Sequence, residues 1–188
     1  FDNCANLKTV MFEDGTTEIA EGLFAGCTGI EQITIPDTVT VIESGAFGGC
    51  INLKEIVVPD NVTEIQSSAF EYCSSLKTVK LSENLERIGV YAFGDCDVLK
   101  SIKIPDSVLD IDGAAFAECK ELSDVVLSKN LKTMGWQVFG NDNKLTEIEI
   151  PKSLEECRYY RNNDSIDGGT FDNCANLKTV MFEDGTTE

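Results

Sequence analysis

The chain has 188 residues, of which 42% are hydrophobic, and it carries a formal net charge of −18 at pH 7. This charge argues against binding to nucleic acid or to an anionic membrane surface, because both would be repelled, and it favours solubility and a basic partner. No apolar run approaches the roughly 18 to 20 residues of a membrane span, and no signal peptide opens the sequence. We therefore expect one soluble domain.

A phenylalanine recurs at a constant interval through most of the chain, and a cysteine three positions later recurs in the same phase. The phenylalanines are Phe1, Phe24, Phe47, Phe70, Phe93, Phe116 and Phe139, and the cysteines are Cys4, Cys27, Cys50, Cys73, Cys96 and Cys119. The interval falls in the range of about 20 to 29 residues that is typical of a leucine-rich-repeat type of solenoid. The pattern predicts a single solenoid over residues 1–188, with these six cysteines in one buried column.

Each repeat, or rung, contains apolar residues at the spacing Leu-x-x-Ile-x-Val. In one rung these residues are Leu53, Ile56 and Val58, and Pro59 follows directly. Apolar residues two apart predict a short strand with one inward face, and a proline at its end predicts a turn. Because eight rungs carry this spacing, we expect eight parallel strands.

A run of small residues precedes each phenylalanine and predicts a second element. In one rung the apolar residues Ala69, Phe70, Cys73 and Leu76 have the spacing of a short helix that a serine could cap. The expected fold class is therefore α/β, a right-handed solenoid with one parallel strand and one short helical turn per 23-residue rung.

The sequence offers little for catalysis. It contains eight cysteines but no histidine, so neither the usual zinc sets with histidine nor a Ser-His or Cys-His pair can form. We expect no enzyme activity, no cofactor and no metal, and we interpret the cysteines as small buried hydrophobes, with disulfides or redox chemistry as the alternative. A column of acidic residues could share calcium ions, although such residues are more typical of solvated turns; it comprises Asp14, Asp37, Asp60, Glu83 and Asp106.

Residues 1–18 and residues 171–188 are identical at all 18 positions, whereas other rungs share only their core columns. The second copy indicates a larger, 170-residue unit that starts again at Phe171. The alternative is a duplicated segment that reflects how the chain was produced. In either case we expect the chain to be an uncapped excerpt of a longer array.

The one break in the period is an inserted loop over residues 158–170, which is much longer than the matching segment of the other rungs. Insertions in repeat arrays map to loops, and loops carry function more often than scaffold does, although simple drift in rung length is the alternative. Tyr159, Tyr160 and Arg161 belong to residue types favoured at binding hot spots. We expect them to contact a protein partner.

The other candidate partner-binding residues flank the inward strand positions and form a shallow strip. They are Gln32, Thr34, Glu55, Val57, Thr78, Lys80, Ser101, Lys103, Asp124, Val126, Glu147 and Glu149. A shallow mixed strip suits a protein surface better than a small-molecule pocket, which needs concave apolar walls.

The motif Ala-Phe-x-x-Cys-x-x-Leu-x-x-Ile-x-Ile-Pro-x-x-Val-x-x-Ile resembles the BspA-type leucine-rich repeats on surface proteins of anaerobic bacteria and trichomonad parasites. The resemblance covers the chain except residues 158–170, although the proline column changes to Glu13, Ser82, Ser128 and Glu183. It implies an extracellular or cell-surface protein that binds host matrix proteins or other cells. We expect a protein-binding module of an adhesin-like protein; the alternative is a structural polymer of 170-residue units continuing head to tail.

Overall fold

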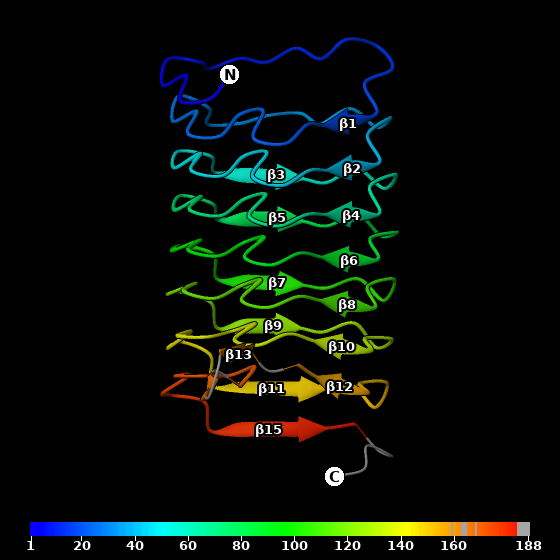
Figure 1. The fold of residues 1–188 in the computed structure, drawn as a ribbon, viewed down its shortest axis with the longest axis vertical. Coiled ribbons are helices and arrows are strands. Elements are labelled where there is room, and N and C mark those ends of the chain that lie inside the picture. The colour runs from blue at the N-terminus through cyan, green and yellow to red at the C-terminus, as the bar shows by residue number, and fades with distance from the viewer. Residues whose placement is uncertain (159, 163–164, 168, 184–188) are drawn as a thin grey trace.

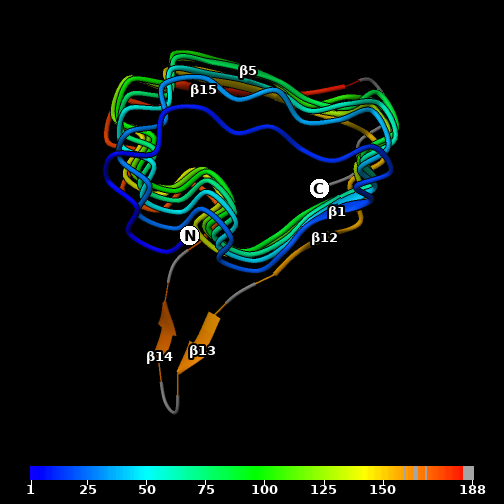
Figure 2. The ribbon, with the colours of Figure 1, turned by 90° about the horizontal axis from the view of Figure 1, so that it is seen from above.

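The computed structural model describes residues 1–158, 160–162, 165–167 and 169–183. The chain winds into a column of stacked rungs, one for each repeat of the sequence (Figure 1). Viewed along the column, the rungs superpose into a closed outline whose strands lie on two opposite sides (Figure 2). The described part of the chain contains no helix with the length and hydropathy that a membrane span requires.

The strands predicted from the Leu-x-x-Ile-x-Val spacing form one side of the column, which we call the strip face. They pair in parallel as β3 with β5, β7 with β9, and β11 with β15. Their bounds are β3 Glu55–Val57, β5 Thr78–Lys80, β7 Ser101–Lys103, β9 Asp124–Val126, β11 Glu147–Ile150 and β15 Thr179–Phe182. The prediction of parallel strands is confirmed for these six rungs. It is wrong for residues 10–12 and 33–35, which lie outside strands.

A second parallel sheet covers the opposite side, with seven strands in the order β1-β2-β4-β6-β8-β10-β12. Its strands are β1 Glu18–Ile19, β2 Val41–Ile42, β4 Glu64–Ile65, β6 Arg87–Ile88, β8 Asp110–Ile111, β10 Thr133–Met134 and β12 Glu156–Cys157. The sequence pattern predicted no strand in that part of the rung. Two residues per strand are too few to show an alternating pattern, so only the stacking of rungs reveals this sheet.

The phenylalanine column forms a continuous stack along the core. Phe47, Phe70 and Phe93 are fully buried, and their ring centroids lie 5.2 Å apart with interplanar angles of 8° and 6°. The stack runs from Phe1 to Phe171 without a missing ring. One rung cannot bury such a ring by itself, so stability must come from contacts between neighbouring rungs.

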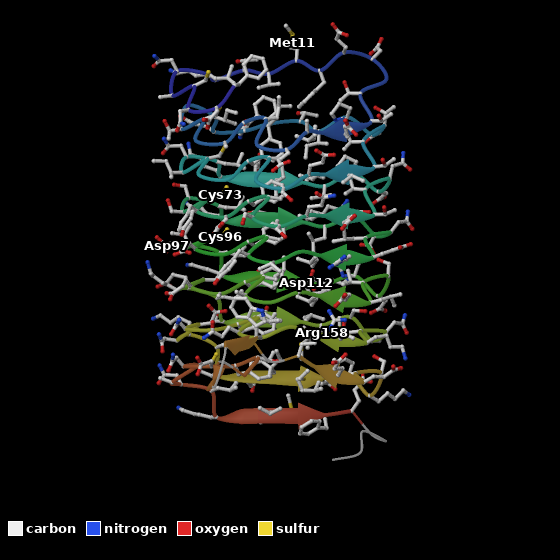
Figure 3. The ribbon with its side chains drawn as sticks, in the orientation of Figure 1. Met11, Cys73, Cys96, Asp97, Asp112 and Arg158 are labelled. Carbon is white, nitrogen blue, oxygen red and sulfur yellow. The ribbon has the colours of Figure 1, made fainter. Side chains whose placement is uncertain are left out.

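The cysteine column lies in the same core, and Figure 3 labels two members on successive rungs. Cys27, Cys50, Cys73, Cys96 and Cys119 are buried free thiols, and each Sγ donates to a phenylalanine carbonyl of the preceding rung at 3.0 to 3.5 Å. The predicted buried column is confirmed for these five. The prediction is wrong for the sixth cysteine, residue 4, which is exposed because no preceding rung covers it.

The predicted helical turn is wrong, because the described residues contain no helix. Each rung from Phe24 to Phe139 instead turns through two left-handed residues that bracket the phenylalanine. Around Phe93 these are Tyr91, with φ of 54°, and Asp95, with φ of 57°. A left-handed residue normally ends a helix, so two of them four positions apart leave no room for one. The amide of Phe93 instead donates to Ala115 of the next rung at 2.8 Å, so the solenoid is all-β rather than α/β.

These turns give a first prediction. Gly45 has φ of +64°, and a Cβ built on it would meet nothing within 4 Å. Gly45→Ala is therefore expected to destabilise the protein by about 1 kcal/mol through backbone strain alone. Urea denaturation measures the loss. Gly169→Ala is the matched control, because a Cβ there also meets nothing and the backbone is not left-handed; equal losses in both variants would contradict the explanation.

Candidate partner-binding surfaces

The strip residues predicted from the sequence lie together on the strip face, and Glu55, Val57, Thr78 and Lys80 are all exposed there. The parallel register places Glu55 opposite Thr78 and Val57 opposite Lys80. Gln32 extends the strip by one rung, since its Nε2 donates to Glu55 Oε1 at 3.2 Å. The structure therefore confirms that these residues share one surface; whether a partner binds there stays a prediction.

The strip is mixed in chemistry. Val57 and Val126 are 56% and 51% exposed among polar and charged neighbours. Lys80 is the register partner of one valine, and Lys103 is the register partner of the other. Isolated exposed valines of this kind are normal on protein surfaces and do not form a large apolar patch.

The inserted loop forms a β-hairpin in the described residues. Strand β13, Tyr160–Asn162, pairs antiparallel with β14, Ser165–Asp167. The register places Tyr160 opposite Asp167 and Arg161 opposite Ile166. Tyr159, the third predicted contact residue, lies outside the described residues.

The hairpin and the strip lie on opposite sides of the column. Figure 2 shows β13 and β14 projecting away from the closed outline on the side of β12, whereas β5 and β15 lie across the core. A partner that binds the hairpin would therefore reach the strip only by extending around the solenoid. The two predicted sets of contact residues therefore lie on different surfaces of the column.

An ion-pair cluster that was not predicted from the sequence lies at the foot of the hairpin. Arg158 follows β12, and its Nη1 lies 3.4 Å from carboxylate oxygens of both Asp110 and Asp112. Asp112 is also held from the other side, where its Oδ2 accepts from Arg87 Nη2 at 2.6 Å. Figure 3 shows Arg158 and Asp112 close together on the column. The cluster ties the start of the insertion to two rungs of the seven-stranded sheet.

A signal for this cluster was present in the sequence. Glu64, Arg87 and Asp110 occupy one column, with one residue on each successive rung, and residues in register on neighbouring strands interact. Arg158 and Asp112 share the next outward column, with Gly135 between them. Because glycine has no side chain, the longer arginine can reach across that rung. The signal was missed because this segment was not recognised as a sheet.

The pKa shifts and hydrogen bonds of the other titratable groups indicate that these groups have structural roles. Burial raises the pKa of the Cys50 thiol to about 12 and that of Cys73 well above its usual range, so neither is a thiolate nucleophile at neutral pH. In the acidic column, Asp60 Oδ1 accepts from the amide of Glu83, and Asp106 Oδ1 accepts from that of Lys129. Among the described residues, no group of three or more potential ligands could hold a metal ion.

The repeat geometry agrees with a sequence comparison. The model of the BspA-type leucine-rich repeat region matches residues 1–120 and 41–161, in six copies. The chain belongs to the BspA-type leucine-rich-repeat family. Proteins of this repeat class are generally non-enzymatic, in keeping with the interpretation of the thiols and carboxylates as structural groups. No curated protein matches the chain.

Solved structures of bacterial leucine-rich-repeat proteins are similar to this chain. A protein from Bacteroides ovatus ATCC 8483 is 32% identical, with a TM-score of 0.82 over 97% of this chain and 51% of its own. A protein from Eubacterium ventriosum ATCC 27560 is 28% identical, with a TM-score of 0.69 over 80% of this chain and 38% of its own. A leucine-rich cell surface protein from Faecalibacterium prausnitzii A2-165 is 27% identical, with a TM-score of 0.52 over 96% of this chain and 61% of its own. The chain thus spans about half the length of the first of these relatives.

Proposed function

We propose that this chain is a protein-binding repeat module of an adhesin-like cell-surface or secreted protein, and that the hairpin β13–β14 is its main contact. The surface location is supported by the family and by the similar protein described as a leucine-rich cell surface protein. The observation that carries the proposal is the hairpin itself. It interrupts an otherwise regular solenoid and stands clear of the column in Figure 2.

The foot of the hairpin supports a binding role. Arg158 is held by two aspartates and by Glu156 Oε2 at 3.6 Å, so the segment enters the hairpin from a fixed point. A protruding element on a fixed base loses less conformational entropy on binding than a free loop would. The net charge of −18 favours a partner with a basic surface, which would also be attracted at long range.

The test compares the hairpin with the strip. Replacing Tyr159, Tyr160 and Arg161 with alanine is expected to weaken binding to a surface coated with extracellular matrix proteins by about 30-fold. This corresponds to about 2 kcal/mol, the usual scale of a hot spot. Biolayer interferometry gives the affinities, and circular dichroism confirms that the fold is retained.

The matched control is the double variant Thr78→Ala, Lys80→Ala on the strip face. It is expected to bind within a few-fold of the parent chain, because Thr78 and Lys80 lie on the side of the column away from the hairpin. If the strip variant loses affinity while the hairpin variant does not, the strip face is the binding site and the insertion is only a change in rung length.

A further inference from the structure

The duplicated segment shows one sequence in two different surroundings. Residues 1–18 form the rung at one end of the column, and residues 171–183 of the second copy form the rung at the other end (Figure 1). The first copy has a neighbouring rung only on its following side, and the second only on its preceding side. Any difference between the two copies therefore comes from the neighbour, since the sequences are identical.

The backbone pairing differs between the copies. The sequence Thr-Val-Met-Phe forms strand β15 at Thr179–Phe182, where all four residues are in register with β11. The same four residues at positions 9–12 lie outside any strand. This sequence therefore joins the sheet where its preceding rung offers the strand β11, and not where its following rung has no strand at residues 33–35.

The preceding neighbour also covers the first phenylalanine and the cysteine of this rung. Phe1 is 68% exposed, whereas Phe171 is half-buried with its ring centroid 5.8 Å from that of Phe139. Cys4 is exposed, whereas Cys174 is buried and its Sγ donates to the Phe139 carbonyl at 2.8 Å. The upper surface of this rung therefore fits the surface that residues 139–150 present.

The following neighbour covers the second phenylalanine of this rung. Phe12 is half-buried against Phe24, with the two ring centroids 6.0 Å apart and the planes perpendicular. Its counterpart Phe182 is 61% exposed, although the same column is at most 7% exposed in every rung between them. The lower surface of the rung therefore fits the surface that begins at residue 19.

The two end rungs have the same sequence but expose opposite surfaces. The surface exposed at one end of the column is therefore covered at the other end. At the first end, an open groove of about 520 Å³ is lined by Phe1, Val10, Met11 and Phe12, and Met11 points away from the column in Figure 3. We propose that these ends are unit-to-unit junctions. One 18-residue rung is shared between two copies of the 170-residue unit, and it contacts residues 139–150 of one copy and residues 19–41 of the next.

This junction makes the column continuous and places the hairpins at regular intervals. Seven rungs separate one hairpin from the next, which is about 34 Å at the usual strand spacing of ~4.8 Å. Such spacing would let one array engage several partner molecules at once, with the gain in avidity that multivalency brings. The junction itself does not depend on what the hairpin binds.

The test uses a tandem chain in which a second copy of residues 19–188 follows residue 188. Small-angle X-ray scattering is expected to show one continuous rod, longer than the single chain by about 34 Å at a rung spacing of ~4.8 Å. A scattering profile of two bodies joined by a flexible segment would overturn the junction.

A pair of matched variants tests the contact surface directly. Phe182→Ala is expected to lower the thermal midpoint of the single chain by less than about 1 °C, because its ring is largely exposed, and that of the tandem by several degrees. Phe12→Ala is the control with the same local sequence, and it should shift both chains equally because its ring packs on Phe24 in each. An equally small effect of Phe182→Ala in both chains would show that the second copy does not cover this rung.

Discussion

Replacing Asp142 with cysteine is expected to stabilise the protein by about 4 kcal/mol at pH 7. Asp142 occupies the cysteine position of its rung and is fully buried. Its Oδ1 accepts from the amide of Cys119 at 2.9 Å, but its Oδ2 has no hydrogen-bond partner in the described structure. Loss of hydration on burial is the main reason why its pKa rises from 3.8 to about 10, with the nearby Cys119 adding to the shift.

The raised pKa makes the stability of the parent chain depend on pH. Below about pH 4 the carboxyl of Asp142 is protonated in both the folded and the unfolded chain, so its ionisation costs nothing. Between about pH 4 and pH 10 the unfolded chain ionises while the folded chain keeps the proton. Stability then falls by about 1.4 kcal/mol for each pH unit, which amounts to about 4 kcal/mol at pH 7.

Urea denaturation of the parent and of Asp142→Cys from pH 4 to pH 9 measures this effect. The advantage of the variant should be small at pH 4 and should grow as the pH rises. Asp37→Asn, at a turn position on the surface of the column, is the control and should keep the pH profile of the parent. Parallel profiles for the parent and Asp142→Cys would show that the buried carboxyl does not govern the pH dependence.

Phe93→Ala is expected to destabilise the protein by about 3 to 5 kcal/mol, the usual range for removing a buried aromatic ring. The ring of Phe93 is fully buried, with centroids 5.2 Å from Phe70 and 5.4 Å from Phe116. Its loss opens a cavity in the middle of the stack and weakens two interfaces between rungs. Because each rung is stabilised by its neighbours, the two halves of the column should also unfold less cooperatively.

Urea denaturation followed by circular dichroism gives both the midpoint and the steepness of unfolding. Phe1→Ala is the matched control, since the same residue type stacks on one neighbour and is 68% exposed. It should cost less than about 1 kcal/mol, in proportion to the smaller area that it buries. Similar losses at both positions would mean that the stack does not carry the stability of the column.

The sequence by itself determined the repeat architecture. Phe47 and Cys50 recur at a constant interval, and residues in phase must stack when each rung has the same length, so the core columns could be predicted. Leu53, Ile56 and Val58 likewise identified the inward face of the strip strands, and all three are buried. The candidate strip followed from the same alternation, because side chains on either side of an inward residue must point outward.

The tertiary structure decided what depends on contacts between rungs. The segment around Phe93 has a helical spacing of apolar residues, yet the Phe93 amide bonds to the next rung rather than to the preceding turn. The seven-stranded sheet and the Asp112–Arg158 contact also join residues far apart in the chain, and local propensity contains no information about them. The sequence Thr-Val-Met-Phe shows this dependence most directly, since it is a strand at Thr179–Phe182 and not at positions 9–12. A strand exists only where a neighbour supplies the other half of its hydrogen bonds, and in a solenoid that neighbour is another rung.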